Sequence, residues 1–417
     1  MKAYMDMSRD ELLAQKAALE EEFKTEEAKG LSLNMARGKP GASQLAISMP
    51  MLDAINSGSD MKTLLGNDTR NYGDWDGIGE CRQLLADMME VKKANVIVCG
   101  NSSLNIMYDT VVRSMVKGVN GSVPWCRLDK VKFLCPVPGY DRHFKITELF
   151  GIEMIPIPMG QDGPDMDLVE KYVSTDDAVK GIWCVPKYSN PTGITYSDEV
   201  VEDFRIFWDN AYCIHHIYDD IHDNILNILE ECEKAGNPNM VYIFASTSKI
   251  SFPGSGVSAI ATSLENMEYI RKFMTTQIIG HDKINQLRHA RFFKNIDGLN
   301  AHMKKHADLL RPKFEAVLQV LDSELSGLGI GSWMKPRGGY FISFEAMPGC
   351  AKAIVEKCAK LGLVLTGAGA TYPYGKDPQD SNIRIAPSFP TPEEMLEATK
   401  MFVLCVKIVS IEKILNK

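Results

Sequence analysis

The chemistry that this sequence could perform centres on a lysine that follows an apolar run and three small hydroxyl residues. Lys249 ends the tetrapeptide Ser246-Thr247-Ser248-Lys249, directly after the apolar residues 241–245. A lysine that attacks carbonyl groups must lie in a partly desolvated place, and small neighbours leave room for a flat ring. The tetrapeptide alone is more typical of a solvated lysine at a strand end. The hypothesis that Lys249 is a covalent attachment site therefore depends on its companions.

A second segment could bind an anion. Cys99-Gly100-Asn101-Ser102-Ser103 joins a β-branched run to the helix-forming residues 104–117. Free backbone amides and the positive end of the helix dipole gather at such a helix start, and the two serines add hydroxyl donors. Simple capping of the helix by Asn or Ser is an equally good interpretation. A phosphate group would fit here.

Three further polar residues follow other apolar runs. Asn190 lies in an Asn-Pro-Thr-Gly turn signal, and its amide could donate a hydrogen bond to a ring oxygen. Asp209 and Tyr212 come directly after residues 205–208, so both could face one ring. A buried carboxylate stays ionised only beside a cation, and a protonated pyridine nitrogen is such a partner. Capping of a helix is the plainer interpretation of Asp209.

One arginine stands between apolar neighbours near the C-terminus. Arg384 lies in residues 381–386, which read as a strand. Its planar guanidinium can hold a carboxylate through two parallel hydrogen bonds. A buried structural ion pair would explain the same pattern equally well. The Gly-rich residues 369–375 are expected to form an ordered loop nearby.

Composition narrows the classes of protein that these residues could serve. The net charge is -8 and no long Lys/Arg stripe occurs, which argues against a nucleic-acid partner. No run approaches about 18 apolar residues and no signal-peptide pattern opens the chain, so we expect neither membrane insertion nor export. The 10 cysteines form no CxxC pair and the 8 histidines have no metal-binding spacing. These features predict a reducing compartment and no metal.

The elements that must position the polar residues form an alternating pattern. Seven short β-branched runs alternate with helical segments, which predicts an α/β fold with a largely parallel seven-stranded sheet and helices on both faces. Ligands bind at the carboxyl ends of strands in such sheets, where the polar residues would converge. The runs cover residues 96–99, 131–135, 153–157, 182–185, 205–208, 241–245 and 257–262.

Chain length and a change of pattern indicate two domains. At 417 residues the chain exceeds what one hydrophobic core usually supports. We expect an N-terminal helix and arm over residues 1–45, in which Ser8 begins a capping box, then a large domain over 46–298 and a smaller α+β domain over 299–417. The small domain should contain a long helix, a strand at 338–341, a helix at 351–360, strands at 364–366 and 383–386, and a terminal helix.

The order and spacing of these motifs resemble a fold-type I aminotransferase that depends on pyridoxal phosphate (PLP), over nearly the whole chain. Each motif is weak, but six in this order are specific together. The stretches at 34–40, 99–104, 190–193, 209–216 and 246–249 are similar to a divergent bacterial branch of aspartate aminotransferases, which is related to the aminotransferase part of MocR-type regulators. No helix-turn-helix segment precedes them, so we do not expect a regulator.

The resemblance implies a role for each site residue. Lys249 would hold the cofactor as a Schiff base and act as general base, and Asp209 would pair with the pyridinium nitrogen. Tyr212 and Asn190 would bind the phenolate oxygen of the ring. The phosphate ligands would be Ser102, Ser103 and Ser246, and Tyr140 would stack on the ring. Tyr72 matches the tyrosine that reaches the phosphate of the partner subunit. The substrate α-carboxylate would be held by Gly38, Asn190 and Arg384.

Two departures from the family pattern raise questions for the structure. Members commonly carry a phosphate-anchoring arginine about eight residues after the lysine; residues 253–257 contain none, so helix amides and serine hydroxyls would hold the phosphate. Only residues 197–204 remain for a crossover helix between Asn190 and Asp209, where parallel strands need about a dozen residues. Asp219 and Asp220, after the apolar-aromatic residues 214–218, are therefore alternatives to Asp209, although His222 stands where a phenol would be wanted.

The resemblance implies a cytoplasmic homodimer with shared active sites, which moves the amino group of an L-amino acid to a 2-oxo acid by a ping-pong mechanism. Aspartate and 2-oxoglutarate are the expected pair, and Lys283, Arg288 or Arg37 would hold the side-chain carboxylate. Another PLP reaction on the same fold, such as β-elimination, is one alternative. A protein that binds PLP and amino acids without turnover is the other.

Overall fold

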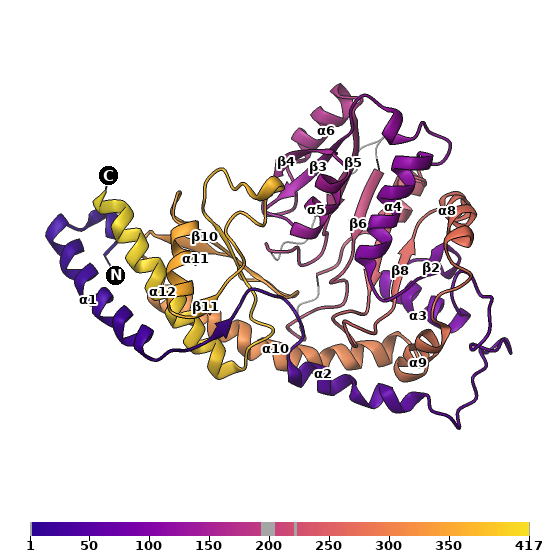
Figure 1. The fold of residues 1–417 in the computed structure, drawn as a ribbon, viewed down its shortest axis with the longest axis horizontal. Coiled ribbons are helices and arrows are strands. Elements are labelled where there is room, and N and C mark those ends of the chain that lie inside the picture. Colours follow the sequence, from indigo (N-terminus) through magenta and orange to yellow (C-terminus); the bar gives the residue numbers. More distant parts are fainter. Residues whose placement is uncertain (1, 193–204, 221–222, 417) are drawn as a thin grey trace.

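The computed structural model describes residues 2–192, 205–220 and 223–416, which form two lobes (Figure 1). The lobe on the right holds a seven-stranded sheet of order β2-β8-β7-β6-β5-β3-β4. Pairing is parallel from β7 to β4 and antiparallel at β8, so the predicted α/β class and mostly parallel sheet are confirmed. Each predicted run overlaps a strand: β2 (Val96–Val98), β3 (Lys132–Val137), β4 (Glu153–Pro158), β5 (Val179–Cys184), β6 (Arg205–Asp209), β7 (Val241–Ser246) and β8 (Ser258–Ala261).

Both faces of this sheet are buried, which explains the continuous apolar runs. Alternate side chains of each strand point to opposite faces, so neighbours such as Phe207 and Trp208 belong to different core clusters. One face packs against α4 (Ser103–Lys117), α5 (Asp141–Leu149) and α8 (Leu264–Gln277). The other packs against α3 (Gly79–Met89), α6 (Met166–Thr175), α7 (Ile228–Lys234) and α9 (Lys283–Phe293).

The lobe on the left contains both ends of the chain (Figure 1). The helix α10 (Ile296–Leu325) runs into it from below the large sheet, and the pair α1 (Arg9–Ala28) and α12 (Pro392–Leu415) covers its outer side. Ser8 begins α1 with the predicted capping box. Between them lie α11 (Ala351–Lys360), a sheet of order β12-β10-β9 (Asn382–Ile385, Ile342–Ala346, Gly331–Trp333) and the parallel pair β1 and β11 (Leu33–Asn34, Leu363–Val364). The short helix α2 (Ala42–Ser48) links the arm to the large lobe.

One predicted strand is wrong. Residues 338–341 do not form a regular strand, and β10 begins only at Ile342. Gly338 and Gly339 instead press against Tyr188, because a Cβ atom at Gly338 would lie 2.4 Å from the Tyr188 ring and Gly339 has a φ of +81°. The two glycines therefore serve a close approach between the lobes rather than a strand.

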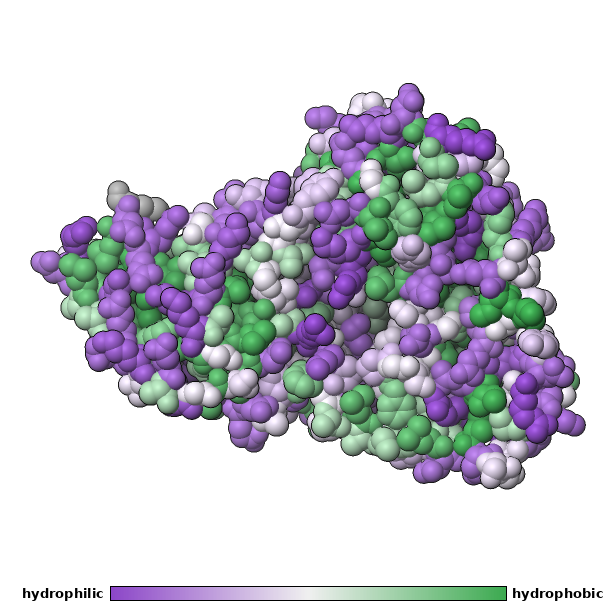
Figure 2. Space-filling view, viewed as in Figure 1, coloured by the Kyte–Doolittle hydropathy of each residue, from purple (hydrophilic) through white to green (hydrophobic). Residues whose placement is uncertain are grey.

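The surface is indented where the two lobes meet, and hydrophilic residues crowd this indentation (Figure 2). The carboxyl ends of β5, β6 and β7 lie at one edge of the sheet because these neighbours are parallel. Gly193 of the predicted turn, the crossover segment 197–204 and His222 lie outside the described residues. Within the described residues, no helix combines the length and apolarity needed to cross a membrane.

Candidate active site

The lysine and the carboxylate singled out by the sequence lie at adjacent strand ends. Asp209 is the last residue of β6 and pairs in register with Phe244 of β7, which ends two residues later at Ser246. Lys249 follows in the turn after β7. Both side chains therefore reach the same edge of the sheet.

Lys249 is held in an aromatic and partly buried place. Its Nζ atom lies 4.8 Å from the centroid of the Tyr212 ring. Burial lowers the pKa of Lys249 from its usual value, and the negative charge of Asp209 opposes this shift. A lower pKa leaves more of the amine neutral, which favours nucleophilic attack on a carbonyl carbon.

Asp209 offers one unused acceptor atom. The residue is 3% exposed, and Oδ2 lies 3.0 Å from Nε2 of His143. Oδ1 is buried and has no hydrogen-bond partner among the described residues. A buried carboxylate oxygen without a donor is costly, and the protonated nitrogen of a PLP ring would supply the missing donor. The site therefore fits this cofactor.

Sequence reasoning missed His143. Its ring stacks on Trp183 at 4.5 Å between centroids and contacts Tyr140 edge-on at 4.9 Å. The signal was faint: on α5 a histidine three residues after Tyr140 faces the same side as that residue, but no helix was predicted there from the sequence. Tyr140 thus lies close to Asp209 through His143, as a ring-stacking residue requires.

The alternative carboxylates do not reach this place. Asp219 and Asp220 are exposed, and Asp219 forms an ion pair of 2.6 Å with Lys304 on the surface. Asp209, by contrast, acts electrostatically on Lys249. The geometry therefore favours Asp209 as the partner of the ring nitrogen.

The serines of the predicted phosphate cradle lie at and near the start of α4. Ser102 is the N-cap residue but makes no side-chain cap hydrogen bond, so its hydroxyl stays available. The hydroxyl of Ser246 donates to Ser248 (3.0 Å), and that of Ser248 donates to the Asn101 carbonyl (3.3 Å). These contacts join the turn after β7 to the helix start that begins with Ser103, as one phosphate site would need.

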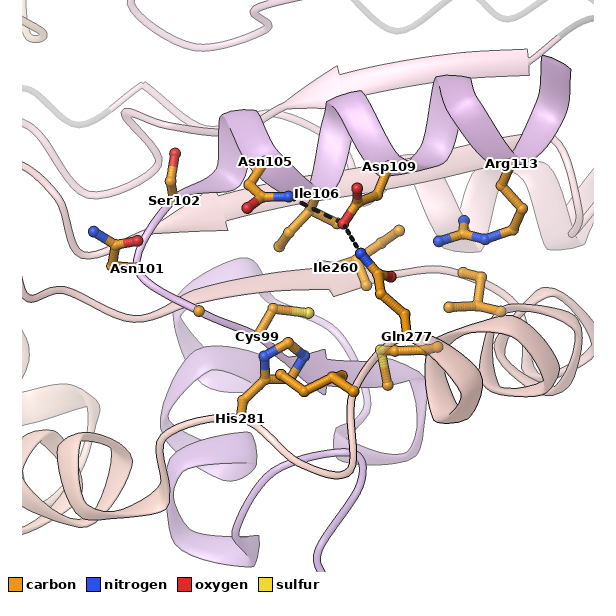
Figure 3. Close-up of a pocket in the computed structure, with 14 residues that line it drawn as sticks. Cys99, Asn101, Ser102, Asn105, Ile106, Asp109, Arg113, Ile260, Gln277 and His281 are labelled. Carbon is orange, nitrogen blue, oxygen red and sulfur yellow. Dashed lines mark hydrogen bonds between the residues drawn. The ribbon is translucent and has the colours of Figure 1, made fainter. Parts of the chain in front are cut away.

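A pocket of about 370 Å³ opens at the start of α4, where Gly100, Asn101 and Ser102 line it. Figure 3 shows Ser102 turning its hydroxyl away from this pocket, whereas Asp109 meets Asn105 and Gln277 inside it. Arg113 lies three turns along α4 from the cradle. The start of α4 and Arg113 therefore border one and the same space.

The residues predicted to hold the substrate α-carboxylate come from both lobes. Arg384 of β12 donates from Nη1 to Oδ1 of Asn190 at 3.1 Å, and its guanidinium lies 4.9 Å from the centroid of the Phe341 ring. Gly38 packs on the same ring, because a Cβ atom there would lie 2.3 Å from Phe341. The structure thus brings Gly38, Asn190 and Arg384 together, at a place where a side chain on residue 38 would collide.

The three cations proposed for the substrate side chain differ in how far they are already engaged. Lys283 is 4% exposed and donates to the carbonyls of Asn71 and Gly73. Arg288 donates to the Ser255 hydroxyl at 2.7 Å. Arg37 is exposed, and no hydrogen bond or ion pair to another described residue holds its guanidinium. Within one chain, Arg37 is therefore the cation with most freedom to meet a ligand.

Lys283 instead fixes the loop that carries Tyr72. Its ammonium group bridges the carbonyls on both sides of this tyrosine, which is 78% exposed. The loop is thus tethered while the Tyr72 side chain itself stays largely open to solvent.

A buried polar network lies behind Lys249 and also escaped sequence reasoning. Gln44 of α2 donates to the Tyr340 hydroxyl at 2.9 Å, which donates to the Lys249 carbonyl at 3.3 Å. The Gln44 amide also lies 3.1 Å from Nδ1 of His306, and Nε2 of His306 lies 3.1 Å from His302. Burial lowers the pKa of His306 to about 4. The network fixes the backbone of the turn that presents the lysine.

Comparisons with known proteins agree with this geometry. The family model for aspartate amino-transferase matches residues 7–417. A Corynebacterium glutamicum protein named aspartate aminotransferase is 44% identical over 409 residues, covering 95% of this chain and 94% of the relative. A crystal structure of an aspartate transaminase from the same species has a TM-score of 0.95 at 42% identity and covers 99% of both chains. LysN, an α-aminoadipate aminotransferase from Thermus thermophilus complexed with a phosphopyridoxyl-leucine, shares the fold at 17% identity with a TM-score of 0.72.

Proposed function

Since this chain belongs to the aspartate amino-transferase family and is a PLP-dependent aminotransferase, we propose that it moves the amino group of aspartate to 2-oxoglutarate. The observation that carries the proposal is the convergence of a partly buried lysine, a carboxylate with an unused oxygen and an arginine grip at one edge of the sheet. Lys249, Asp209 and Arg384 are the three groups that amino transfer from an α-amino acid requires.

Each group has a defined task. When bound, PLP supplies an electron sink for the bond to the substrate Cα atom. The Lys249 amine would hold the cofactor and would serve as the base that takes and returns the substrate α-proton. Asp209 keeps the ring nitrogen protonated through Oδ1, while His143 holds Oδ2. Asn190 and Tyr212 bind the phenolate oxygen, and Tyr140 stacks on the ring.

The phosphate is assigned to the backbone amides at the start of α4 and to the hydroxyls of Ser102, Ser103 and Ser246. The helix dipole and these donors can hold a phosphate without an arginine from residues 253–257. Arg288 would support this phosphate site indirectly, because its guanidinium donates a hydrogen bond to the Ser255 hydroxyl in the loop that follows the turn of Lys249.

Two observations support aspartate as the donor. The named relatives at 42–44% identity are an aspartate aminotransferase and an aspartate transaminase. Arg37, one residue from Gly38 in the arm, has no partner among the described residues and could hold a second carboxylate. Arg384 would hold the α-carboxylate, and Gly38 packs on Phe341, the ring that lies beside the Arg384 guanidinium.

We propose a cytoplasmic homodimer in which Tyr72 of one subunit reaches the phosphate in the other. The exposure of Tyr72 and the tether of its loop to Lys283 support this assignment. The large lobe, residues 46–298, would then carry the dimer contacts, while the arm and the small domain, residues 1–45 and 299–417, close over the substrate.

A matrix of amino donors and 2-oxo acids, assayed on PLP-loaded protein, tests the proposal. We expect the highest kcat/KM for aspartate with 2-oxoglutarate, and parallel lines in double-reciprocal plots, as a ping-pong mechanism requires. Ammonia release without any 2-oxo acid would favour β-elimination instead. Cofactor binding without turnover in any pair would favour a binding protein.

A further inference from the structure

The Arg384 guanidinium is already engaged by groups of the protein itself. Oδ1 of Asp141 lies 3.0 Å from Nη1 of Arg384, the same nitrogen that donates to Asn190. The Arg384 side chain is 9% exposed and that of Asp141 is 28% exposed, so the pair is largely shielded from water. A carboxylate of the protein thus already occupies the guanidinium that would bind the substrate.

The other contacts of Arg384 leave little room for a second carboxylate. Nη2 lies 3.3 Å from the Thr366 hydroxyl, and Nε is buried without a partner among the described residues. Asp141 also lies 3.9 Å from Arg142, but its closer partner is Arg384. Because Nε is buried, a side-on pair through Nε and Nη2 is closed to an incoming ligand, and a substrate carboxylate that binds in the two-pronged manner must take Nη1 together with Nη2.

The ion pair also joins the two lobes. Asp141 is the first residue of α5, on the large sheet, whereas Arg384 lies in β12 of the small sheet. A substrate bound by Arg384 above the cofactor would bridge the same two lobes. Asp141 thus makes in the ligand-free chain the kind of link that the substrate makes later.

We propose that Asp141 is an internal competitor of the substrate α-carboxylate: its carboxylate holds Nη1 of Arg384 in the ligand-free enzyme and must leave when substrate binds. The inference rests on the proposed role of Arg384 as the α-carboxylate anchor. An orienting role for Asp141 is unnecessary, since the neutral Asn190 oxygen already fixes the same nitrogen. Two carboxylates on one guanidinium repel each other, so the competitor weakens binding.

The competition has a distinctive kinetic signature. Amino donors and 2-oxo acids both carry the α-carboxylate, so Asp141 should raise both Michaelis constants by the same factor. A residue that reads the substrate side chain would change them unequally. The same exchange should speed product release, because the returning Asp141 carboxylate would displace the product carboxylate from Arg384.

The test is Asp141→Asn, which removes the charge and keeps the shape. We expect the KM values of aspartate and 2-oxoglutarate, and the Kd of the unreactive dicarboxylate succinate measured by calorimetry, each to fall about tenfold, as for a charge-assisted hydrogen bond at a partly shielded site. The affinity for PLP should not change. Asp141→Ser should act alike, which guards against a folding defect peculiar to one variant.

Matched controls separate charge from position. Asp167→Asn removes an exposed charge from the first turn of α6 and should leave all three constants unchanged. Thr366→Val removes a neutral contact of Arg384 and should not tighten binding. Unchanged or raised constants in both Asp141 variants would overturn the inference. If Arg384→Lys also leaves these constants unchanged, the anchor assignment itself fails; if it raises them, only the competitor role fails.

Discussion

Replacing Asp209 by Asn perturbs the most sharply defined contact of the site. The change removes the negative charge while keeping the volume of a residue that is 3% exposed. Oδ2 would keep a contact with His143 in one amide orientation, but the atom at Oδ1 could no longer offer a charged acceptor to a ring nitrogen. The substitution therefore tests electrostatics rather than packing.

The expected loss of rate follows from the burial of the charge pair that Asp209 would form with the ring nitrogen. Loss of one partner from a buried charge pair costs about 3–5 kcal/mol. Since each 1.4 kcal/mol of lost transition-state stabilisation slows a reaction about tenfold, the half-reaction with the amino acid should fall by about two to four orders of magnitude. Asp219→Asn, whose carboxylate is exposed and paired with Lys304, should stay within about tenfold of the parent.

Stopped-flow absorbance of the half-reaction with the amino acid alone measures this without interference from the second substrate. Near-normal rates in Asp209→Asn together with a collapse in Asp219→Asn would refute the reasoning. That result would place the functional carboxylate ten residues later in the chain.

Three further predictions concern the substrate grip, the subunit contact and the response to pH. Arg384→Lys, which loses the planar fork, should weaken aspartate and 2-oxoglutarate binding together while PLP affinity stays constant; equal Michaelis constants in parent and variant would count against it. Light scattering should show a dimer, and Tyr72→Phe should weaken PLP binding; a fully active monomer would contradict both. Burial lowers the pKa of His289 and His306 to about 4, so the unfolded chain binds more protons between about pH 4 and 6.5, and stability rises with pH there. Urea unfolding should therefore give a free energy lower by about 2 kcal/mol per histidine at pH 5 than at pH 7.5, and equal values would show that these histidines are accessible.

Much of the large sheet could be predicted because its strands are buried on both faces. Near-continuous β-branched and aromatic runs such as residues 241–245 leave a strong local signal, and parallel neighbours fix where their ends meet. The run at 338–341 was misread because its apolar composition matches a strand, whereas its two glycines serve contact with Tyr188. Nothing within a few residues of the segment reveals that distant neighbour.

The candidate site likewise contains residues that could be predicted from the sequence and residues that could not. Lys249, Asp209 and Asn190 follow strands, so their convergence could be inferred from the chain order. His143, Gln44 and the histidines of α10 enter through contacts between residues far apart in sequence, such as the 262-residue separation of Gln44 and His306.

The contacts that already hold Lys283 and Arg384 could not be predicted from the sequence either. Lys283 reads as a free charge, yet its ammonium group is held by backbone carbonyls more than 200 residues away. The ion pair of Asp141 with Arg384 spans 243 residues, so only the folded chain shows that the grip is occupied. Such contacts depend on the relative placement of whole elements, which local patterns do not encode.

The central claim is that Lys249 attaches the cofactor, and borohydride reduction of the PLP-loaded enzyme followed by peptide mass spectrometry tests it most directly. Reduction converts the bond between lysine and cofactor into a stable pyridoxyl-lysine, which marks the attachment site. We predict a stoichiometric label on the peptide that contains Lys249, and no label on the chain in Lys249→Ala. A label on another lysine, such as Lys187 or Lys283, or a full label that persists in Lys249→Ala, would contradict the account.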